Sequence, residues 1–204
     1  MKLKKCKICA DYFEKKTPLQ MVCSPACAIK YSQNQKIKLW NKKKVQLKVS
    51  SGAYNKEFKQ TLQIEINRLS KLIDASFYNS CIDCGKSFGK QIDAGHFSSI
   101  GANASLRYNL HNIHSQKSDC NQNGLGGGKR LEYRRGLEKR YSFDYAEYVE
   151  FELPTKYPLI KLSSVELQEK ISLVRKLIRD YDTFKFENAI FARSAFNNLI
   201  GIYK

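Results

Sequence analysis

The stretch that decides the fold is QIDAGHFSSIGANASLRYNLHNIHSQKSDCNQNGLGGG, residues 91–128. It contains all three histidines of the chain, His96, His111 and His114, together with Cys120. Two strand-like segments, QIDAGHF and NIHS, flank a loop, and SDCNQN opens a short helix. The glycines from Gly124 to Gly128 then predict a flexible stop. The sequence therefore predicts a compact strand–loop–strand–helix unit that holds the scarce reactive residues.

The charge of the chain is strongly positive and uneven. Among 204 residues, 36 Lys and Arg stand against 19 Asp and Glu, a formal charge of +17. Residues 1–60 hold 15 lysines and three acids, which gives 15 − 3 = +12. This excess favours a polyanionic partner, most simply nucleic acid. Two alternatives stay open: a basic protein without such a partner, or one that touches anionic lipid.

Neither a membrane segment nor a leader is expected. The basic start MKLKKCKIC is not followed by an apolar run, and no run approaches the length of a membrane span. No basic amphipathic helix with an aromatic face stands out either, so we expect no membrane partner. The expected compartment is the cytoplasm, where thiols stay reduced and closely spaced cysteines indicate metal ligands.

The first cysteine set has the spacing of a closed zinc site. Cys6-x2-Cys9 is followed, after thirteen residues, by Cys23-x3-Cys27. Two such pairs can converge on one tetrahedral Zn²⁺ with Zn–S distances of about 2.3 Å. Four thiolates leave no open position, so the zinc is predicted to be structural and to supply folding free energy. The alternative is a set of buried or redox-active cysteines.

The second cysteine set offers only three of the four thiolates that a closed zinc site needs. Cys81-x2-Cys84 requires a second pair, but only Cys120 lies downstream, and the position where its partner would stand is Lys117. A fourth zinc ligand could be His111, His114 or water, or zinc could bind weakly or not at all.

Around these cysteines, the order of residues matches the ββα-metal or HNH nuclease finger. In that layout His96, whose ordinary pKa is near 6.5, takes a proton from the water that attacks a phosphodiester. Asn112 orients His96 by accepting its other ring N–H, and Asn121 helps to hold one Mg²⁺ or Mn²⁺. The second ligand of this cation is Asp93 or His114. Asp93 qualifies because residues 93 and 95 share a face of a strand, and position 95, where many HNH fingers carry an acid or histidine, is Gly95.

Each of these residues also has an ordinary interpretation. His96 could be a packed histidine, Asn112 and Asn121 could cap a turn and a helix, and Asp93 could be a solvated strand residue. A structural zinc finger without catalysis is therefore the alternative, and the nuclease hypothesis depends on the joint order of the residues.

Two apolar stripes predict long helices. In each stripe, apolar residues recur at spacings of 4, 3 and 4. The first stripe is Leu62, Ile66, Leu69 and Ile73, and the second is Leu167, Ile171, Val174 and Ile178. Ser163 with Glu166 forms a capping-box signature before the second stripe. The stripes could be intramolecular core, which we favour, or a dimer seam. Pro25 after Ser24 predicts a helix start. SSGAYN at 50–55 predicts a break between the basic segment 28–50 and the helix from Glu57, and PTKYP at 154–158 predicts a break after the basic helix KRLEYRRGLEKRY.

The predicted fold class is α+β, mainly helical, with an N-terminal four-cysteine zinc module and a central ββα-metal (HNH-like) finger. The expected segments are a zinc module (1–30), a basic helical region (31–76), a nuclease domain (77–150) and a C-terminal helical region (151–204).

Six segments together resemble the phage NinG (Rap) recombination proteins over roughly residues 4–180: CKICADYFEKKTPLQMVCSPACA, CIDCG, DAGHFSSIGA, LRYNLHNIHSQ, CN and EYRRGL. The resemblance implies a structure-specific endonuclease that acts on branched DNA, including Holliday junctions and D-loops, in phage recombination. It also implies a phage or prophage origin and a bacterial host cytoplasm. Many relatives carry a full CxxC before the asparagine, where this chain has Lys117. The alternatives are a non-catalytic zinc-dependent DNA-binding or recombination accessory protein, and an HNH nuclease without branch specificity.

Basic and aromatic residues beside these modules are the candidate DNA contacts: Trp40, Lys42, Lys43, Lys44, Arg107, Arg134 and Arg135. Any one of them could equally be an exposed helix residue. Because a four-way junction has near two-fold symmetry and needs paired cuts, a homodimer is also expected as a hypothesis.

Overall fold

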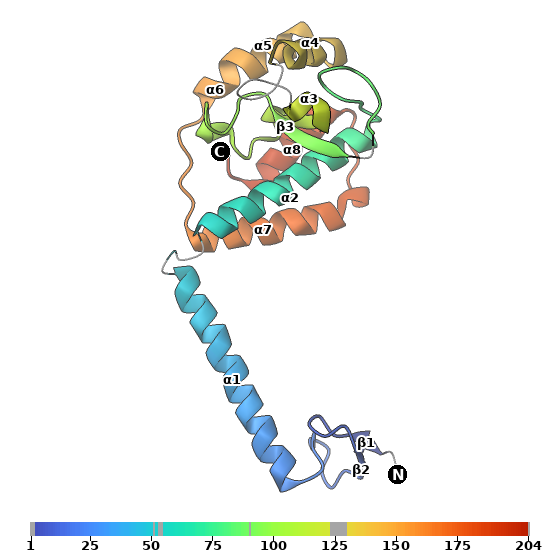
Figure 1. Ribbon diagram of the computed structural model, residues 1–204, viewed down its shortest axis with the longest axis vertical. Helices are drawn as coiled ribbons and strands as arrows, with labels where there is room; N and C mark the ends of the chain where they lie inside the picture. The colour runs from blue at the N-terminus through green and yellow to red at the C-terminus, as the bar shows by residue number, and fades with distance from the viewer. Residues whose placement is uncertain (1–2, 51, 53–54, 90, 123–129, 204) are drawn as a thin grey trace. The chain divides into compact units, whose positions relative to one another are not determined.

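The computed structural model describes residues 3–50, 52, 55–89, 91–122 and 130–203 (Figure 1). Helices dominate these residues, which confirms the prediction of a mainly helical chain. The predicted stop from Gly124 to Gly128, and most of the break expected at 50–55, lie outside the described residues. Among the described helices, none is both long enough and apolar enough to cross a membrane.

The chain divides into two compact units, residues 1–53 and 54–204. The boundaries expected after residues 30, 76 and 150 differ from this division. Residues 31–76 form two helices that belong to different units, and residues 77–204 share one unit. The reason is that the second of those helices packs on a helix near the C-terminus, as described below.

The first unit pairs a small cysteine-rich hairpin with one long helix. Strand β1 (Lys4–Lys5) is antiparallel to β2 (Tyr12–Phe13), and α1 runs over Pro25–Ser50. The predicted start at Pro25 is confirmed; proline is favoured there because the first helical N–H has no intrahelical acceptor. Helix α1 contains seven lysines and no acidic residue.

The second unit holds the remaining elements. They are α2 (Asn55–Ser76), β3 (Ile92–His96), β4 (Ile113–Lys117), α3 (Ser118–Gln122), α4 (Arg130–Arg140), α5 (Phe143–Glu147), α6 (Leu153–Lys156), α7 (Ser164–Arg179) and α8 (Ala189–Ile200), with the short helical turns η1 (Ala104–Leu106), η2 (Leu110–Asn112), η3 (Tyr148–Glu152) and η4 (Tyr181–Thr183). The break expected at 154–158 is wrong in part. Pro154 lies in the first turn of α6, where its missing N–H is tolerated, and the helix ends only at Lys156.

The predicted strands and the helix after them are confirmed as a β3–β4 hairpin followed by α3. The strands are antiparallel, with Ile92 opposite Lys117 and His96 opposite Ile113. Side chains alternate between the two faces of such a hairpin. One face meets α2, and the other meets α4 through the contacts of Tyr133 with Gly95 and His114.

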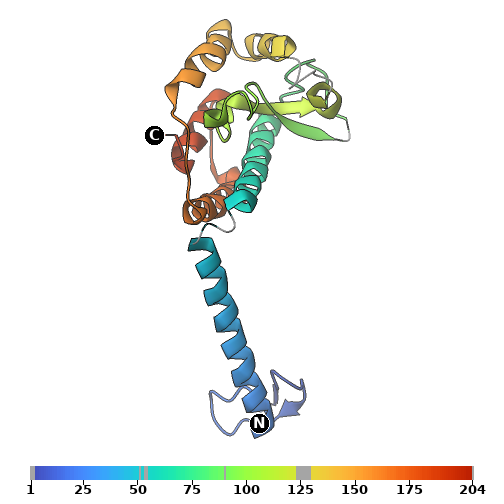
Figure 2. The same ribbon diagram turned by 60° about the vertical axis from the view of Figure 1, so that its left-hand side comes forward.

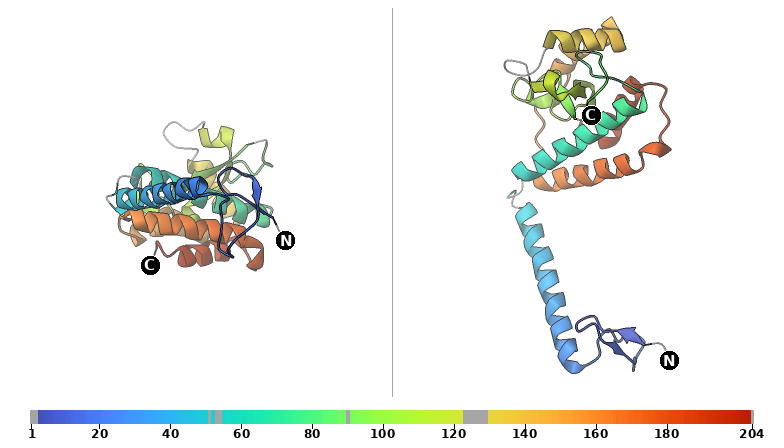
Figure 3. Two further views of the ribbon diagram at one scale, coloured as in Figure 1. Left: turned by 90° about the horizontal axis from the view of Figure 1, so that it is seen from below. Right: turned by 45° about the vertical axis from the view of Figure 1, so that its right-hand side comes forward.

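The main core forms where the two apolar stripes meet, so both helix predictions are confirmed. Leu62, Ile66, Leu69 and Ile73 of α2 are buried with Leu167, Ile171 and Val174 of α7, and the predicted capping box of Ser163 and Glu166 is present. Helix α2 lies side by side with α7, as Figures 1 and 3 show. The stripes are thus intramolecular core, and the alternative of a dimer seam along them is wrong.

A second apolar cluster covers the opposite face of the hairpin. Its buried members come from the second cysteine knuckle, the loop after β3, helices α4 and α5 and the residues after α5: Ile82, Phe97, Tyr133, Leu137, Tyr145, Ala146 and Val149. The hairpin therefore lies between α2 on one side and the α4–α5 region on the other (Figure 2). Gly136 allows this approach, because a Cβ there would lie 1.7 Å from the backbone oxygen of Ile82.

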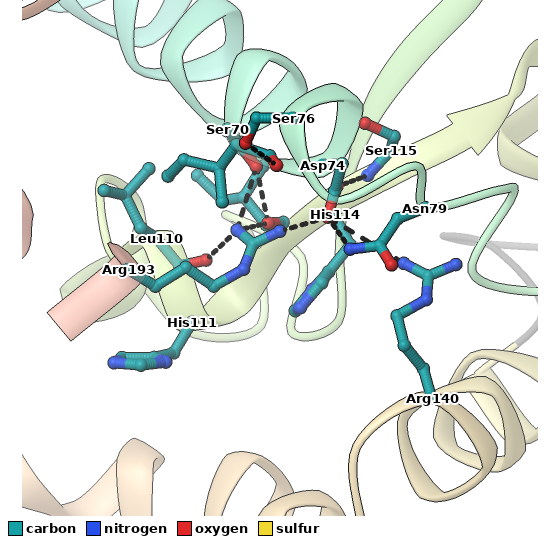
Figure 4. A network of polar contacts seen from close by, with 12 residues as sticks. Ser70, Asp74, Ser76, Asn79, Leu110, His111, His114, Ser115, Arg140 and Arg193 are labelled. Carbon is teal, nitrogen blue, oxygen red and sulfur yellow. Dashed lines mark hydrogen bonds and ion pairs between the residues drawn. The ribbon is translucent and has the colours of Figure 1, made fainter. Parts of the chain in front are cut away.

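A buried ion pair joins α8, α2 and the hairpin (Figure 4). The guanidinium of Arg193, fully buried, donates to Asp74 Oδ1 at 2.7 Å and to the backbone oxygens of Leu110 and Ile113, each at 2.7 Å. The other carboxylate oxygen of Asp74 accepts the backbone N–H of Ser115 at 2.7 Å. A charge pair with so many additional hydrogen bonds meets the condition under which burial of ions is tolerated.

Replacing Arg193 with methionine is expected to lower the free energy of unfolding by about 3–5 kcal/mol, because Asp74 then stays buried with only the more distant guanidinium of Arg140, at 3.9 Å, as a cation. Urea titration of the full chain measures this. The matched control is Arg175→Met: Arg175 pairs with Glu65 at 2.7 Å but is 54% exposed, so about 0–1 kcal/mol is expected there. Equal losses for the two variants would contradict the structural role of Arg193.

Candidate functional site

The ring of His96 is fixed by the loop that connects the two strands. His96 is the last residue of β3 and is half-buried. Its Nε2 lies 3.1 Å from the backbone oxygen of Arg107. A carbonyl oxygen can only accept a hydrogen bond, so this contact assigns the proton to Nε2 and leaves a lone pair on Nδ1.

Gln63 of α2 contacts the same ring nitrogen with its amide group, whose N–H can donate only to an unprotonated Nε2 and so competes with the contact to the Arg107 carbonyl. Its Nε2 lies 3.3 Å from His96 Nε2, a longer contact than that to the carbonyl of Arg107, and it already donates to Asn67 Oδ1 at 2.8 Å. Its Oε1 accepts from Nε of Arg107 at 3.3 Å. Gln63 thus joins the side chain of Arg107 to α2, beside the carbonyl that orients His96.

Burial lowers the pKa of His96 below its ordinary value. The hydrogen bond to the Arg107 carbonyl opposes this shift, and the charge of Arg107 adds to it. The imidazole is therefore neutral at neutral pH, with Nδ1 free to accept a proton. Among the described residues, Nδ1 has no hydrogen-bond partner.

The role predicted for Asn112 needs a correction. Its side chain does not accept the ring N–H of His96. Oδ1 accepts the backbone N–H of Ser98 at 2.8 Å, while Nδ2 donates to the backbone oxygens of Ser98 at 3.0 Å and Leu106 at 3.4 Å. Asn112 is fully buried under the loop of residues 97–112, so its amide closes that loop. It positions His96 indirectly, through the loop that carries the Arg107 carbonyl and through its own backbone oxygen, which accepts the N–H of Phe97 at 2.9 Å.

Asp93 and Asn121 come together as the sequence predicts. Nδ2 of Asn121 donates to Oδ2 of Asp93 at 3.1 Å. The amide oxygen of Asn121 and the carboxylate of Asp93 are oxygen ligands of the kind that hard divalent cations prefer. Asp93 and His96 are three positions apart, however, so alternation directs them to opposite faces of β3. Their contacts agree, because Asp93 meets α3 while His96 meets α2.

His114 is not a ligand of that cation in this arrangement. It is fully buried, with Nδ1 at 2.9 Å from the hydroxyl of Tyr133. Burial lowers the pKa of His114 well below its ordinary value. His111 is also interior, between the hydroxyls of Tyr145 at 2.9 Å and Ser194 at 3.1 Å. Neither imidazole therefore completes the second cysteine set, which corrects two of the alternatives left open by the sequence.

The two cysteine sets could each hold a metal ion. The sulfur atoms of Cys6, Cys9, Cys23 and Cys27 lie within 4.8 Å of one another, and so do those of Cys81, Cys84 and Cys120. Cys9 and Cys23 are 3.4 Å apart, and Cys23 and Cys27 are 3.7 Å apart. Tetrahedral Zn²⁺ with Zn–S bonds of about 2.3 Å requires sulfur separations of about 3.8 Å. The first set fits a closed four-thiolate zinc site.

Backbone N–H groups favour the thiolate form in the first set. Burial alone would raise the pKa of the Cys6 thiol. Hydrogen bonds from backbone N–H groups outweigh this effect and lower the pKa to about 6. Two of these donors are Ile8 at 3.5 Å and Cys23 at 3.4 Å. Because the thiolate is the form that binds zinc, these backbone N–H groups favour the form of Cys6 that can act as a ligand.

The predicted arginine contacts separate into two groups. Arg134 was predicted to contact phosphate, but its guanidinium pairs with three carboxylates, those of Glu138, Glu147 and Glu150, which disfavours that role. Arg135 is exposed and lines a hollow of about 390 Å³ with Lys139 and Arg140. Acidic side chains therefore neutralise Arg134, whereas its neighbour Arg135 faces a basic hollow.

Sequence reasoning missed a second basic hollow beside the His96 loop. It measures about 460 Å³ and is lined by Asn55, Lys56, Lys59, Gln60 and Arg107. Lys56 and Lys59 are three residues apart at the start of α2, so they share a helix face. That spacing was a readable signal. In the first unit, Trp40 of α1 is 65% exposed, and Lys42, Lys43 and Lys44 are exposed beside it.

Comparison with known proteins identifies relatives of one kind. The model of the bacteriophage lambda NinG protein family matches residues 1–183. The protein ninG of Escherichia phage lambda is 37% identical over 70 residues, 34% of this chain and 33% of that protein. The ninG proteins of Escherichia phage 933W and Enterobacteria phage VT2-Sa are each 26% identical over 162 residues, 72% of this chain and 80% of theirs. No solved structure matches the chain.

Loss of two thiolates in the first cysteine set is expected to release one zinc per chain. In the double variant with Cys23→Ser and Cys27→Ser, only two thiolates remain, and residues 3–24 lose the metal that holds their small hairpin together. A chromophoric chelator counts the zinc, and thermal unfolding followed by circular dichroism should show the second unit melting as before, because the two units are separately compact. The control Cys120→Ser, which also leaves two thiolates, should remove the other metal instead. Unchanged zinc content in the double variant would exclude a four-thiolate site.

Proposed function

Because the chain belongs to the NinG family of bacteriophage lambda, we propose that it is a metal-dependent endonuclease that cleaves branched DNA, such as Holliday junctions and D-loops, in phage recombination. The observation that carries the proposal is the tautomer of His96. The Arg107 carbonyl accepts from Nε2 at 3.1 Å, and this leaves Nδ1 as a base at the end of β3. The base ends the first strand of a hairpin and lies beside a loop closed by Asn112, and a short helix follows the second strand, the order of elements in an HNH-like finger.

In the proposed reaction, Nδ1 of His96 takes a proton from a water molecule. The water oxygen forms a new bond to phosphorus, the bond from phosphorus to the leaving oxygen breaks, and that oxygen ends with a proton from solvent. Asp93 and Asn121 would hold a Mg²⁺ or Mn²⁺ ion, which would neutralise the charge that builds on the phosphate oxygens. Asn112 acts as a positioning residue, since it closes the loop whose carbonyl fixes the ring.

The substrate approaches across an edge. In the described part of the chain this sheet has two strands, so one edge of β3 pairs with no other strand. Asp93 and His96 are three positions apart, about 10 Å along the strand, and face opposite sides. The reaction requires both groups at one phosphate, and only a phosphate at this edge can approach both, so this edge is the path we propose for the DNA.

Positive charge supports DNA as the substrate. Helix α1 offers exposed lysines without an acid to compensate them, and Lys56, Lys59 and Arg107 line a hollow beside the loop of His96. Lysine contacts with phosphates carry no sequence information. Such contacts suit recognition of a branched shape, for which a nuclease needs no preferred sequence. Paired cuts on a junction would require two active sites, so we also propose a homodimer, formed on a surface other than the buried stripes.

A DNA-binding protein without catalysis is the second candidate. It is favoured by one observation: the contacts of His96 and of the Asp93–Asn121 pair lead to different helices, α2 and α3. An HNH nuclease without branch specificity is the third. A labelled synthetic junction and a linear duplex of the same sequence separate all three. Binding without cleavage supports the second candidate, and equal cleavage of both substrates supports the third.

Removal of the proposed base is expected to abolish most cleavage but not binding. With a labelled junction and Mg²⁺ or Mn²⁺, His96→Ala should lower the single-turnover rate by about 10²–10⁴-fold, the usual contribution of a general base. His111→Gln is the matched control, because His111 is a histidine bonded to Tyr145 and Ser194 away from the hairpin edge. Cleavage by His96→Ala at the wild-type rate would remove His96 from the mechanism.

The pH dependence of cleavage has a defined sign. Burial lowers the pKa of His96, and the base must be neutral to accept a proton. The single-turnover rate should therefore stay high as the pH falls to the ordinary histidine value near 6.5, and drop only below it. A rate that halves above pH 7 would contradict this assignment.

The salt dependence of binding should report the lysines of α1. Removing one lysine–phosphate interaction reduces the slope of log K against log salt by about 0.9, so Lys42, Lys43 and Lys44 changed together to Gln should reduce it by up to about 2.7. Filter binding over a range of salt concentrations measures the slope. The control changes Lys161, Lys176 and Lys185 to Gln, which removes the same charge from exposed positions of the second unit. Equal slopes for the two triple variants would exclude α1 as the DNA-binding element.

A further inference from the structure

The two cysteine knuckles have the same local geometry. In the first, the N–H of Ala10 donates to the backbone oxygen of Cys6 at 3.1 Å, and Ala10 has a left-handed backbone with φ 64°. In the second, the N–H of Gly85 donates to the backbone oxygen of Cys81 at 3.0 Å, with φ 67° at Gly85. In both cases, the left-handed residue directly follows the second cysteine of the pair.

The equivalence extends to the segment that faces each knuckle. In the first module the backbone N–H of Cys23, itself a ligand candidate, donates to Sγ of Cys6 at 3.4 Å. In the second module the backbone N–H of Lys117 donates to Sγ of Cys81 at 3.3 Å. Lys117 therefore stands at the position where the first module has its third thiolate.

No other side chain of the chain supplies the missing ligand. The remaining four cysteines belong to the first module, and the three histidines are bonded elsewhere. Residues outside the described ranges include no Cys, His, Asp or Glu. Among the described carboxylates, none has an oxygen within 4.8 Å of the three sulfurs. Asp83 accepts a hydrogen bond from Nε2 of Gln116 at 2.8 Å, and Asp119 is exposed at the start of α3.

We propose that zinc in the second module is held by Cys81, Cys84 and Cys120 alone and has an exchangeable fourth ligand. This ligand is water in the free protein, and a small nitrogen or sulfur donor such as imidazole or a thiol replaces it. Three thiolates with one open position form the coordination pattern of zinc sites that take exogenous ligands, whereas the first module forms the closed pattern of structural sites. The inference concerns the metal site only and does not depend on nuclease activity.

X-ray absorption of the full chain loaded with zinc tests the proposed coordination, because it gives the mean number of sulfur ligands per zinc. Four ligands in the first module and three in the second give a mean of (4 + 3)/2 = 3.5 with two zinc ions per chain. Lys117→Cys should raise the mean to 4, and Lys117→Ala should leave it at 3.5. The same chain loaded with Co²⁺ should change its visible spectrum when imidazole is added. This response should persist in Lys117→Ala and vanish in Lys117→Cys.

The zinc affinity of the second module should follow the same order. A fourth thiolate is expected to lower the dissociation constant by about tenfold or more in Lys117→Cys, measured by chelator competition. Any of three results for the unmodified chain would overturn the proposal: a mean of four sulfur ligands, a single zinc per chain, or a cobalt spectrum that does not change when imidazole is added. If Lys117→Cys fails to fold, the unmodified chain and Lys117→Ala still decide it by these readouts.

Discussion

The ion pair between Asp74 and Arg193 is the interaction on which the rest of the second unit depends. A two-stranded hairpin is at best marginally stable alone, so β3 and β4 need a partner surface. Asp74 provides one by accepting the backbone N–H of Ser115, and Arg193 provides another by donating to the backbone oxygens of Leu110 and Ile113. The pair itself is completely buried. Without it, the polar backbone at the start of β4 would face an apolar interior.

The candidate base depends on this anchor through a short series of contacts. The ion pair fixes the backbone at Leu110 and Ile113, which places Asn112 between them. Asn112 then closes the loop of residues 97–112 by bonding Ser98 and Leu106, and the next carbonyl of that loop, at Arg107, fixes the tautomer of His96. A residue with no contact to the imidazole therefore determines which ring nitrogen can act as a base.

Local patterns in the sequence predicted the elements but not their long-range pairing. The spacing of Leu62, Ile66 and Leu69 specified one helix face, and the Cys-x2-Cys pairs specified tight turns, because both depend on neighbours a few residues away. The role of Asn112 and the pairing of Arg134 were not predictable in this way. Arg193 and Asp74 are 119 positions apart, and nothing in the local sequence of α8 distinguishes a buried arginine from an exposed one. Alternation along β3 was readable, but its consequence for His96 and Asp93 required knowing which helix covers each face.

The distribution of charge and of reactive residues suggests a division of labour between the two units. Residues 1–60 have a net charge of +12 of the total +17, which leaves 17 − 12 = +5 for the remaining 144 residues, 204 − 60 = 144. All three histidines lie in this less basic part. Affinity for a polyanion would then come mainly from α1, and the second unit would need only to place a base and a cation at the edge of one strand. Under the proposed function, Arg134 can be neutralised by three glutamates without loss of DNA-binding charge, because the lysines of α1 would supply that charge.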